Sequence, residues 1–184
     1  MTLLWNKPGV AESIDKYWVE SVDEVNYRKL LAKHVIQEID RGKILEVGCG
    51  SGLVYKALKE ETELLKYVGI DISHSMLKLA KDRFPDVRFE LGNINKIKVK
   101  DNSFNVVICF EVLGHLKDIV VPIKELIRVT KKVCMFTLWI CGGSVPIFYN
   151  DRYEYPDSMI REIIGDYKIE IVNFPWTRMY KVYK

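Results

Sequence analysis

Residues 44–52, ILEVGCGSG, constrain the fold of this chain more than any other segment. An apolar run ends in three glycines at alternate positions, Gly48, Gly50 and Gly52, and a helix-like pattern follows at 53–59. In an α/β protein, a strand that leads into a glycine turn at the start of a helix is the usual place for a nucleotide-like cofactor. A dinucleotide site would need the spacing G-x-G-x-x-G, but Leu53 stands where its third glycine belongs. The spacing therefore disfavours a nicotinamide oxidoreductase.

The rest of the chain alternates strand-like and helix-like patterns, which indicates a mostly parallel sheet. Helices are expected at 13–20, 22–39, 53–59, between the capping Ser73 and Pro85, at 119–129 and at 157–164. Strands are expected at 43–47, 67–70, 87–91, 104–110, 133–139, 167–174 and 179–183, with Thr130, Lys131 and Lys132 as a short loop before the fifth.

The last two strands are joined by a tight turn at Pro175 and Trp176, which is too short for a crossover helix, so this pair must be antiparallel. The fold class we expect is α/β: a doubly wound, seven-stranded, mostly parallel sheet with an antiparallel C-terminal hairpin and helices on both faces. We expect a single domain over residues 1–184.

Length and composition fit a globular protein with a good core, because 184 residues with 48% hydrophobic and 29% charged side chains are ordinary for that class. The net charge of +3 neither suggests nor excludes a nucleic-acid partner, since the basic residues are scattered among acids. The four cysteines contain no C-x-x-C pair and the three histidines are isolated, so we expect no metal site.

Two observations bear on location. Residues 133–149 carry no charge, but they are fewer than the roughly 20 that a spanning helix needs, so we expect a buried strand and an apolar loop without membrane insertion. The first ten residues lack the long apolar region of a signal peptide, and the thiols in apolar runs suit a reducing compartment. We therefore expect a cytoplasmic protein.

Further motifs accompany the glycine run at the expected spacings: DISHSML at 71–77, GNI at 92–94, SFNVV at 103–107 and FEVLGHL at 110–116. Together with E-x-G-x-G-x-G, they resemble the class I (Rossmann-like) S-adenosylmethionine (SAM)-dependent methyltransferases, and in particular the small stand-alone members of the type 11 group. The resemblance covers nearly all of residues 40 to 140. Asn93 and Asn105 depart from it, because the family has Asp at both positions.

The resemblance implies SAM as the cofactor and assigns roles to single residues. Asp71 ends a strand at the distance expected of a ribose-binding acid, and its alternative is a capping or surface role. Glu46 would lie beneath the methionine part of SAM, or would be a structural acid. Asn93 would accept a hydrogen bond from the adenine amino group in place of the family's acid. The full set of cofactor-binding residues expected is Glu46, Gly48, Cys49, Gly50, Gly52, Asp71, Ile72, Met76, Asn93, Ile94, Phe110 and Tyr17.

Several roles stay open at this point. His115 is the best candidate for a general base, but a histidine that packs against or caps the next helix is the interpretation we favour. Cys49 could be a nucleophile near a helix N-terminus, although we expect only its backbone and small size to matter. Tyr17 and Trp18 could belong to a lid formed by residues 1–40 over a Rossmann-like core at 41–184, or could pack in the core. A larger group of aromatic residues could line an acceptor pocket or simply pack: Phe148, Tyr149, Tyr153, Tyr155 and Trp176.

The function expected from the resemblance is transfer of a methyl group from SAM, by in-line displacement, to a small-molecule acceptor. Methylation of protein or RNA is the second possibility. The third is a SAM-binding partner protein without catalytic activity, which the two asparagine departures and the short loop at Thr130 keep open. The sequence does not indicate an oligomeric state.

Overall fold

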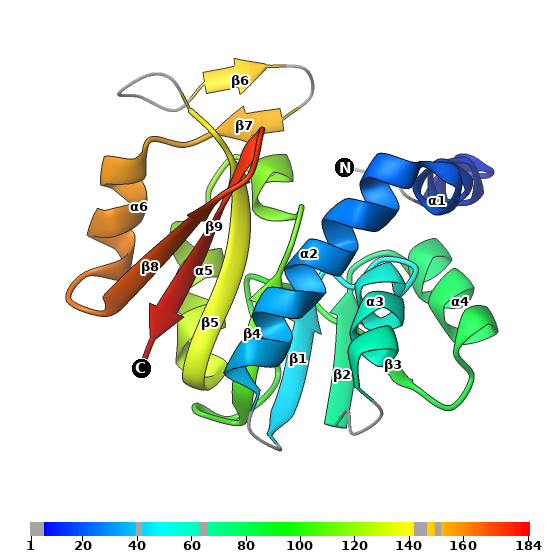
Figure 1. Cartoon of the computed structure of the whole chain (residues 1–184), viewed down its shortest axis with the longest axis horizontal. Coiled ribbons are helices and arrows are strands. Elements are labelled where there is room, and N and C mark those ends of the chain that lie inside the picture. Colours follow the sequence, from blue (N-terminus) through cyan, green and yellow to red (C-terminus); the bar gives the residue numbers. More distant parts are fainter. Residues whose placement is uncertain (1–5, 40–41, 63–65, 142–146, 150–151) are drawn as a thin grey trace. The chain divides into compact units, whose positions relative to one another are not determined.

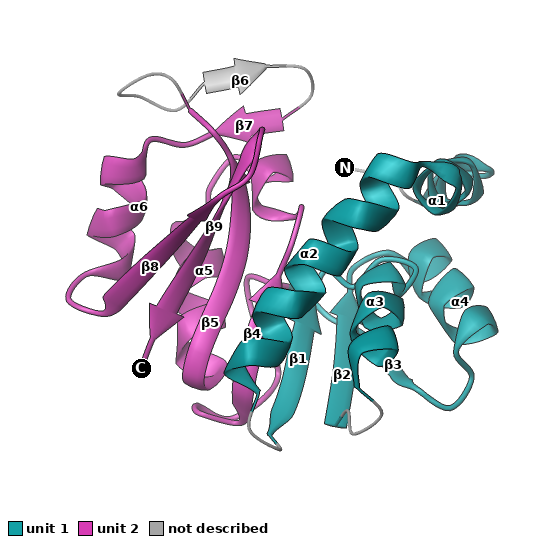
Figure 2. Ribbon diagram, viewed as in Figure 1, with its two compact units in different colours: residues 1–93 teal, residues 94–184 magenta. Residues whose placement is uncertain are grey.

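The computed structural model describes residues 6–39, 42–62, 66–141, 147–149 and 152–184. It contains two compact units, Met1–Asn93 and Ile94–Lys184, shown in different colours in Figure 2. No helix in the described part of the chain is long and apolar enough to cross a membrane.

Unit 1 has three parallel strands in the order β3-β2-β1, with helices before and between them (Figure 1). In chain order its elements are α1 (Val10–Glu20), α2 (Val22–Glu38), β1 (Lys43–Val47), α3 (Leu53–Glu61), β2 (Lys66–Asp71), α4 (His74–Arg83) and β3 (Arg88–Leu91). The Ser73 hydroxyl accepts a hydrogen bond from the Met76 amide at 3.2 Å, so the predicted cap of α4 is confirmed.

An aromatic cluster packs between α3 and the sheet of unit 1. Tyr55 of α3 lies 4.8 Å from Tyr67 and 5.0 Å from Phe84, measured between ring centroids. The cluster needs a glycine on β2, because a Cβ on Gly69 would lie 2.7 Å from the Phe89 ring and 2.9 Å from the Cys49 sulfur. Close packing of the sheet, the glycine turn and α3 therefore depends on that one missing side chain.

Unit 2 continues the main sheet with four strands in the order β4-β5-β9-β8, in which β9 runs antiparallel to both of its neighbours. Its elements are β4 (Phe104–Cys109), the 3₁₀ turn η2 (Leu113–His115), α5 (Val120–Val129), β5 (Thr130–Trp139), β6 (Ile147–Tyr149), β7 (Arg152–Glu154), α6 (Asp157–Ile164), β8 (Lys168–Asn173) and β9 (Thr177–Tyr183). Helices α5 and α6 contact each other, and Asp157 at the start of α6 accepts a hydrogen bond from the Tyr180 hydroxyl at 2.9 Å.

The predicted fold class is confirmed: the strands of units 1 and 2 are the seven strands of a mostly parallel sheet with an antiparallel C-terminal pair. Several boundaries are wrong: α1 begins at Val10 and not at 13, β9 at Thr177 and not at 179, and β5 at Thr130 and not at 133. Thr130, Lys131 and Lys132 are the first residues of β5 and not a loop. Thr130 pairs with Phe104 of β4 while its hydroxyl donates to the Leu126 carbonyl at 2.7 Å, so one residue closes α5 and begins β5. The β6–β7 hairpin and η2 were not predicted.

Candidate cofactor and acceptor sites

The alternate spacing of the glycines in the turn after β1 follows from the backbone angles at these positions. Gly48, Gly50 and Gly52 have φ angles of 79°, 51° and 81°, a region that residues with a Cβ rarely adopt. The amides of Gly48 and Cys49 both donate to the Ile70 carbonyl, at 2.7 and 3.0 Å, which fixes the turn to the end of β2. A Cβ on Gly50 would meet no atom within 4 Å, so the turn presents its backbone to open space there.

Asp71 joins this turn to the start of α4. One carboxylate oxygen accepts a hydrogen bond from the Gly50 amide and the other from the Ser73 amide, each at 2.8 Å. Burial raises the pKa of Asp71 above its usual value, and the backbone amides act in the opposite direction. Because a carboxylate oxygen can accept more than one hydrogen bond, Asp71 keeps acceptor capacity for a pair of hydroxyl groups. The remaining acceptor capacity of Asp71 and the open space at Gly50 therefore fit a ribose.

Glu46 lies in the interior of unit 1 and is only 2% exposed. The Tyr67 hydroxyl donates a hydrogen bond to its carboxylate. Burial raises the pKa of Glu46 to about 8, while the hydrogen bond from Tyr67 and the positive charge of Arg28 lower it. Near neutral pH the Glu46 carboxyl group is therefore protonated in most molecules. This state suits a structural acid, and it also suits an acid that ionises when a cationic group binds.

Cys49 faces the packed interior of the turn. The residue is 4% exposed, and burial raises the pKa of its thiol well above the usual value. A thiol held in its neutral form is a poor nucleophile, so the structure favours the packing role.

Three residues that the motifs did not indicate connect the N-terminal segment to this turn. Arg83 of α4 donates to the Ser51 carbonyl at 2.6 Å and pairs with Asp15 of α1 at 2.6 Å. Asn6 accepts a hydrogen bond from the Ser73 hydroxyl at 2.8 Å. The sequence offered one signal for these contacts, the charged Asp15 on the apolar side of an amphipathic helix. This signal does not identify Arg83 as the partner.

The other residues expected at the cofactor in unit 1 differ in exposure. Met76 is buried at 3% exposure, whereas Ile72 is 44% exposed and Asn93, at the end of the unit, is also exposed. Tyr17 is 62% exposed on α1, so its side chain does not pack into the core of unit 1. Unit 1 thus brings together Glu46, Gly48, Cys49, Gly50, Gly52 and Asp71 at the carboxyl ends of β1 and β2.

In unit 2, Ile94 and Phe110 are buried, at 9% and 5% exposure. Glu111, two residues after the end of β4, has a φ of 58° and is held by Thr137 of β5. Its amide donates to the Thr137 hydroxyl at 2.8 Å, and that hydroxyl lies 2.9 Å from the Glu111 carboxylate. A left-handed backbone at a residue with a Cβ is costly and persists only where its surroundings hold it in place.

His115 is exposed in η2, and its ring meets the edge of Trp139 at 5.6 Å between centroids. Tyr153 and Tyr155 lie near each other, 6.3 Å apart, and the Tyr155 hydroxyl donates to the Leu116 carbonyl. Trp176 is 57% exposed in the turn before β9. The side chains of Phe148 and Tyr149 lie outside the described part of the structure, so their expected place in an acceptor pocket stays a prediction.

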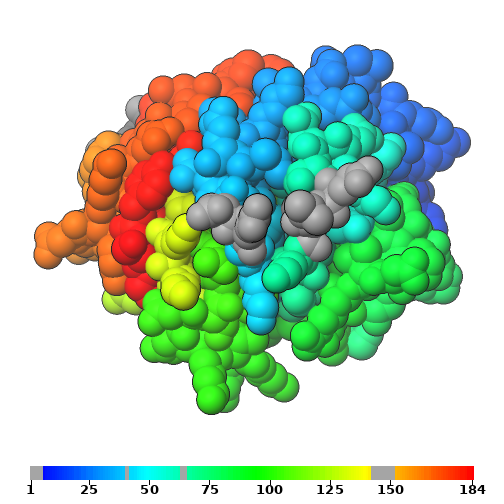
Figure 3. All heavy atoms as spheres, turned by 60° about the horizontal axis from the view of Figure 1, so that its bottom comes forward, coloured from blue at the N-terminus to red at the C-terminus, as the bar shows by residue number. Residues whose placement is uncertain are grey.

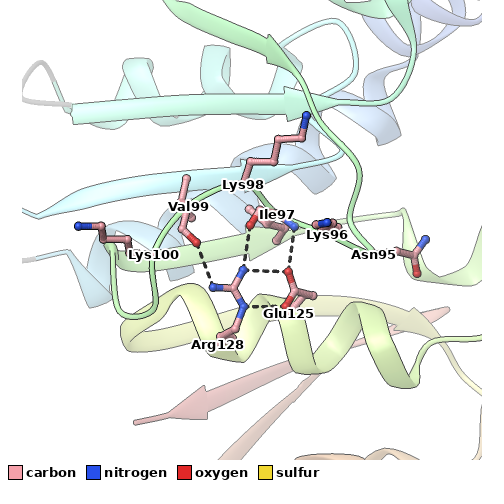
Figure 4. Close-up of a pocket in the computed structure, with 8 residues that line it drawn as sticks. All are labelled: Asn95, Lys96, Ile97, Lys98, Val99, Lys100, Glu125 and Arg128. Carbon is pink, nitrogen blue, oxygen red and sulfur yellow. Dashed lines mark hydrogen bonds and ion pairs between the residues drawn. The ribbon is translucent and has the colours of Figure 1, made fainter.

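Unit 2 also has an open groove of about 510 Å³, lined by Asn95, Lys96, Ile97, Lys98, Val99, Lys100, Glu125 and Arg128. Arg128 pairs with Glu125 at 2.6 Å and donates to the carbonyls of Ile97 and Val99, which holds the segment before β4 against α5 (Figure 4). Lys98 and Lys100 point away from Arg128 in this view. The segment that carries these lysines lies at the surface (Figure 3).

A family model described as "Methyltransferase domain" matches residues 45–137 of the chain. An uncharacterized methyltransferase of Schizosaccharomyces pombe is 33% identical over 107 residues, which are 52% of this chain and 38% of that protein. A demethylmenaquinone methyltransferase of Thermotoga maritima is 30% identical over 84 residues, which are 46% of this chain and 36% of that protein. The chain thus spans less than half the length of these curated relatives.

Among solved structures, magnesium protoporphyrin IX methyltransferase from Synechocystis, with bound S-adenosylhomocysteine (SAH), is similar over 98% of this chain and 96% of its own, with a TM-score of 0.76. The sequence identity is 15%, so this likeness shows the fold alone.

Proposed function

The chain belongs to the methyltransferase domain family of SAM-dependent enzymes, and from that premise we propose that it transfers the methyl group of SAM to a small-molecule acceptor. The observation that carries the proposal is Asp71, bound by the amides of Gly50 and Ser73 beside a turn of three left-handed glycines. An acid fixed in this way beside open backbone can bind both hydroxyls of a ribose.

The roles proposed for the cofactor follow from the arrangement of unit 1. Asp71 binds the ribose, and the turn at Gly48, Gly50 and Gly52 lets the cofactor approach the backbone closely. Glu46 contributes negative charge beneath the methionine part once a cationic group lowers its pKa from about 8. The remaining contacts expected from the family pattern are those of Cys49, Ile72, Met76, Asn93, Ile94, Phe110 and Tyr17.

The sulfonium of SAM is itself an activated methyl donor. The residues of the chain therefore need to orient the acceptor and exclude water, and they need not form a covalent intermediate. A base is required only if the acceptor must lose a proton, and the candidate for that role is His115, which is exposed in η2. Its edge contact with Trp139 also fits the packing role that we favour.

A small-molecule acceptor is supported by the relatives and by unit 2. The names of two similar proteins specify small molecules, demethylmenaquinone and magnesium protoporphyrin IX. In this chain, aromatic side chains gather after the carboxyl ends of β4 and β5, where α/β sheets bind ligands: His115, Trp139, Tyr153 and Tyr155.

Binding of SAM is tested first, by thermal unfolding with SAM, SAH and NAD. A ligand at a hundred times its Kd stabilises the folded protein by about 2.7 kcal/mol, so binding gives a clear rise in Tm. We expect a rise with SAM and SAH only. Stabilisation by NAD alone would refute the proposal.

The acceptor class is tested with methyl-labelled SAM and fractions of a cell extract that contain small molecules, RNA or protein. We expect label in the small-molecule fraction. Label in a macromolecular fraction would overturn that assignment, and SAM binding without transfer to any fraction would favour a non-catalytic SAM-binding protein.

RNA is the second candidate acceptor, and one observation favours it. The groove before β4 is lined by three exposed lysines, Lys96, Lys98 and Lys100, whereas its acid Glu125 is already paired with Arg128. Such a surface can bind phosphates. Within unit 2, however, this segment precedes β4, whereas ligands of parallel sheets bind beyond the carboxyl ends of the strands. The groove therefore supports RNA less well than the aromatic residues support a small molecule.

Three further expectations from the sequence stay proposals. They are the single-domain organisation of residues 1–184, a lid function for residues 1–40 and a cytoplasmic location. The lid receives support from Asn6 and Asp15, which connect the N-terminal segment to Ser73 and Arg83.

A further inference from the structure

Trp139, the last residue of β5, has a fixed place in unit 2. A Cβ on Gly114 of η2 would overlap the Trp139 ring, so the indole lies against bare backbone. The guanidinium carbon of Arg152, in β7, lies over the same ring at 4.7 Å from its centroid. Three separate elements therefore hold one aromatic ring and one cation together.

The position of β7 is also fixed. Tyr155, just after β7, donates its hydroxyl hydrogen bond to the Leu116 carbonyl beside η2, and its backbone forms a bridge with Ile140. Tyr155 is 3% exposed and therefore works as an anchor. Arg152 thus extends from a strand that is attached on two sides. Because this strand is already ordered, binding a ligand there costs less conformational entropy.

Arg152 is not satisfied by the groups around it. Within the described residues its Nε is buried without a hydrogen-bond acceptor, and its guanidinium makes no hydrogen bond or ion pair. A cation–π contact contributes about 0.5–2 kcal/mol but satisfies none of the five N–H donors of an arginine. Most buried donors in natural proteins are paired, so a buried Nε without a protein partner calls for water or a ligand.

The chemistry of that ligand follows from the guanidinium. Contact with Trp139 restricts its position, and its terminal Nη donors form a planar fork that matches the two oxygens of a carboxylate. The neighbouring rings of His115 and Tyr153 offer faces and edges for a flat molecule. These groups follow β4 and β5, on the side of the sheet where ligands bind.

We propose that Arg152 binds the carboxylate of a planar, aromatic acceptor and that Trp139 supports the guanidinium for this purpose. The inference rests on the proposed function, since it names the chemical class of the methyl acceptor. Arg152 here is a specificity-determining residue: it selects an acid and leaves the methyl-transfer step to other groups.

The test uses benzoate as the probe, with benzamide as its neutral analogue and inorganic phosphate as a second anion. Binding to the full chain, saturated with SAH, is measured by ligand-observed NMR. Wild type should bind benzoate more tightly than benzamide or phosphate. Arg152→Met should weaken benzoate binding about tenfold to a hundredfold, the loss expected for a charge-assisted hydrogen bond, and Arg152→Lys should weaken it less.

The matched control is Arg178→Met. Arg178 is an arginine of β9 in the same unit, and its Nε donates to Asn173 at 3.1 Å. This variant should bind benzoate as wild type does. The inference is overturned if Arg152→Met and wild type bind benzoate equally, if benzamide binds as tightly as benzoate, or if phosphate alone binds through Arg152.

Titration of SAM into SAH-free samples of the same proteins separates this inference from the proposed function. Unchanged SAM affinity in Arg152→Met, with loss of benzoate binding, supports both. Failure of every variant and of wild type to bind SAM refutes the proposed function, while benzoate binding that depends on Arg152 would still establish a carboxylate site. If Arg152→Met lowers the Tm, benzoate binding is judged instead from Arg152→Lys, which keeps the charge. This variant should bind benzoate more weakly than wild type.

Discussion

Asp71 is the residue on which the cofactor assignment depends most. In Asp71→Asn the side-chain NH₂ must face one of the two amides, of Gly50 and Ser73, that the carboxylate now accepts from. We expect SAM to bind about tenfold more weakly or worse, as measured by isothermal titration calorimetry. Asp82→Asn is the control, because Asp82 is an exposed acid of α4 paired with Lys78. Wild-type affinity in Asp71→Asn would contradict a ribose-binding role.

A second prediction for a single residue concerns Glu46 and the pH dependence of the protein's stability. Its pKa is about 8 in the folded protein, against 4.5 as the ordinary value. The stability linked to this group is therefore fully present below about pH 4.5 and is lost as the pH rises through about 8, because only the unfolded chain ionises easily.

Glu46→Gln keeps an acceptor for the Tyr67 hydroxyl but cannot ionise. Relative to wild type, its free energy of unfolding should rise by at most about 1.4 kcal/mol per pH unit between these limits, as measured by urea unfolding at pH 5 to 8. Glu60→Gln, whose side chain is 46% exposed in wild type, should follow the wild-type profile. Parallel profiles for wild type and Glu46→Gln would show that Glu46 does not carry this effect.

At the scale of elements, the attachment of α1 depends on Arg83. The Arg83–Asp15 pair has side chains 26% and 12% exposed, so water screens it less than a surface pair. A double-mutant cycle with Arg83→Met and Asp15→Asn should give a coupling energy of about 1–3 kcal/mol, and hydrogen exchange in α1 should become faster in either variant.

The corresponding cycle on Lys78 and Asp82 is the matched control, because their side chains are 75% and 61% exposed. It should give no measurable coupling energy, because water screens an exposed pair. If Arg83→Met leaves hydrogen exchange in α1 unchanged, this ion pair does not hold the helix.

The same connection has a functional side. Arg83 also donates to the Ser51 carbonyl of the glycine turn, so the loss of Arg83 disturbs α1 and the turn together. If residues 1–40 form the lid that we propose, Arg83→Met should weaken SAM binding by more than Asp15→Asn, which leaves the bond to Ser51 in place.

At the scale of the whole molecule the net charge of +3 is small, but three of the 28 basic residues lie together in one groove: Lys96, Lys98 and Lys100. Replacing all three by Gln should abolish salt-sensitive binding of RNA, as measured by fluorescence anisotropy, and should leave SAM affinity and transfer to small molecules unchanged. Loss of SAM affinity in this variant would show that the groove contributes to the cofactor site.

Local patterns predicted most of the elements. β1, with Lys43–Val47, was predicted residue for residue, because its apolar run is bounded by a turn that only glycines can form. The cap at Ser73 and the antiparallel pair β8–β9 were predicted for similarly local reasons, a side-chain hydrogen bond and a short connection.

What the sequence did not reveal depends on distant partners. Tyr67 and Glu46 lie 21 residues apart, and Arg83 lies 68 residues from Asp15, so no local period relates them. The Trp139 ring contacts Gly114 and Arg152, which belong to two other elements. The start of β5 was missed because Lys131 and Lys132 are exposed and read as a loop, although they belong to the strand, at a register shift between its pairs with Phe104 and Val106.

That junction has an evolutionary consequence. Since Thr130 is both the C-cap of α5 and the first residue of β5, no spare residue lies between helix and strand. The register shift between the pairs Phe104–Thr130 and Val106–Val133 already takes up one extra residue of β5. One further residue inserted beyond it would turn every following side chain to the opposite face of the sheet, so natural insertions should spare the stretch from Val133 to Trp139.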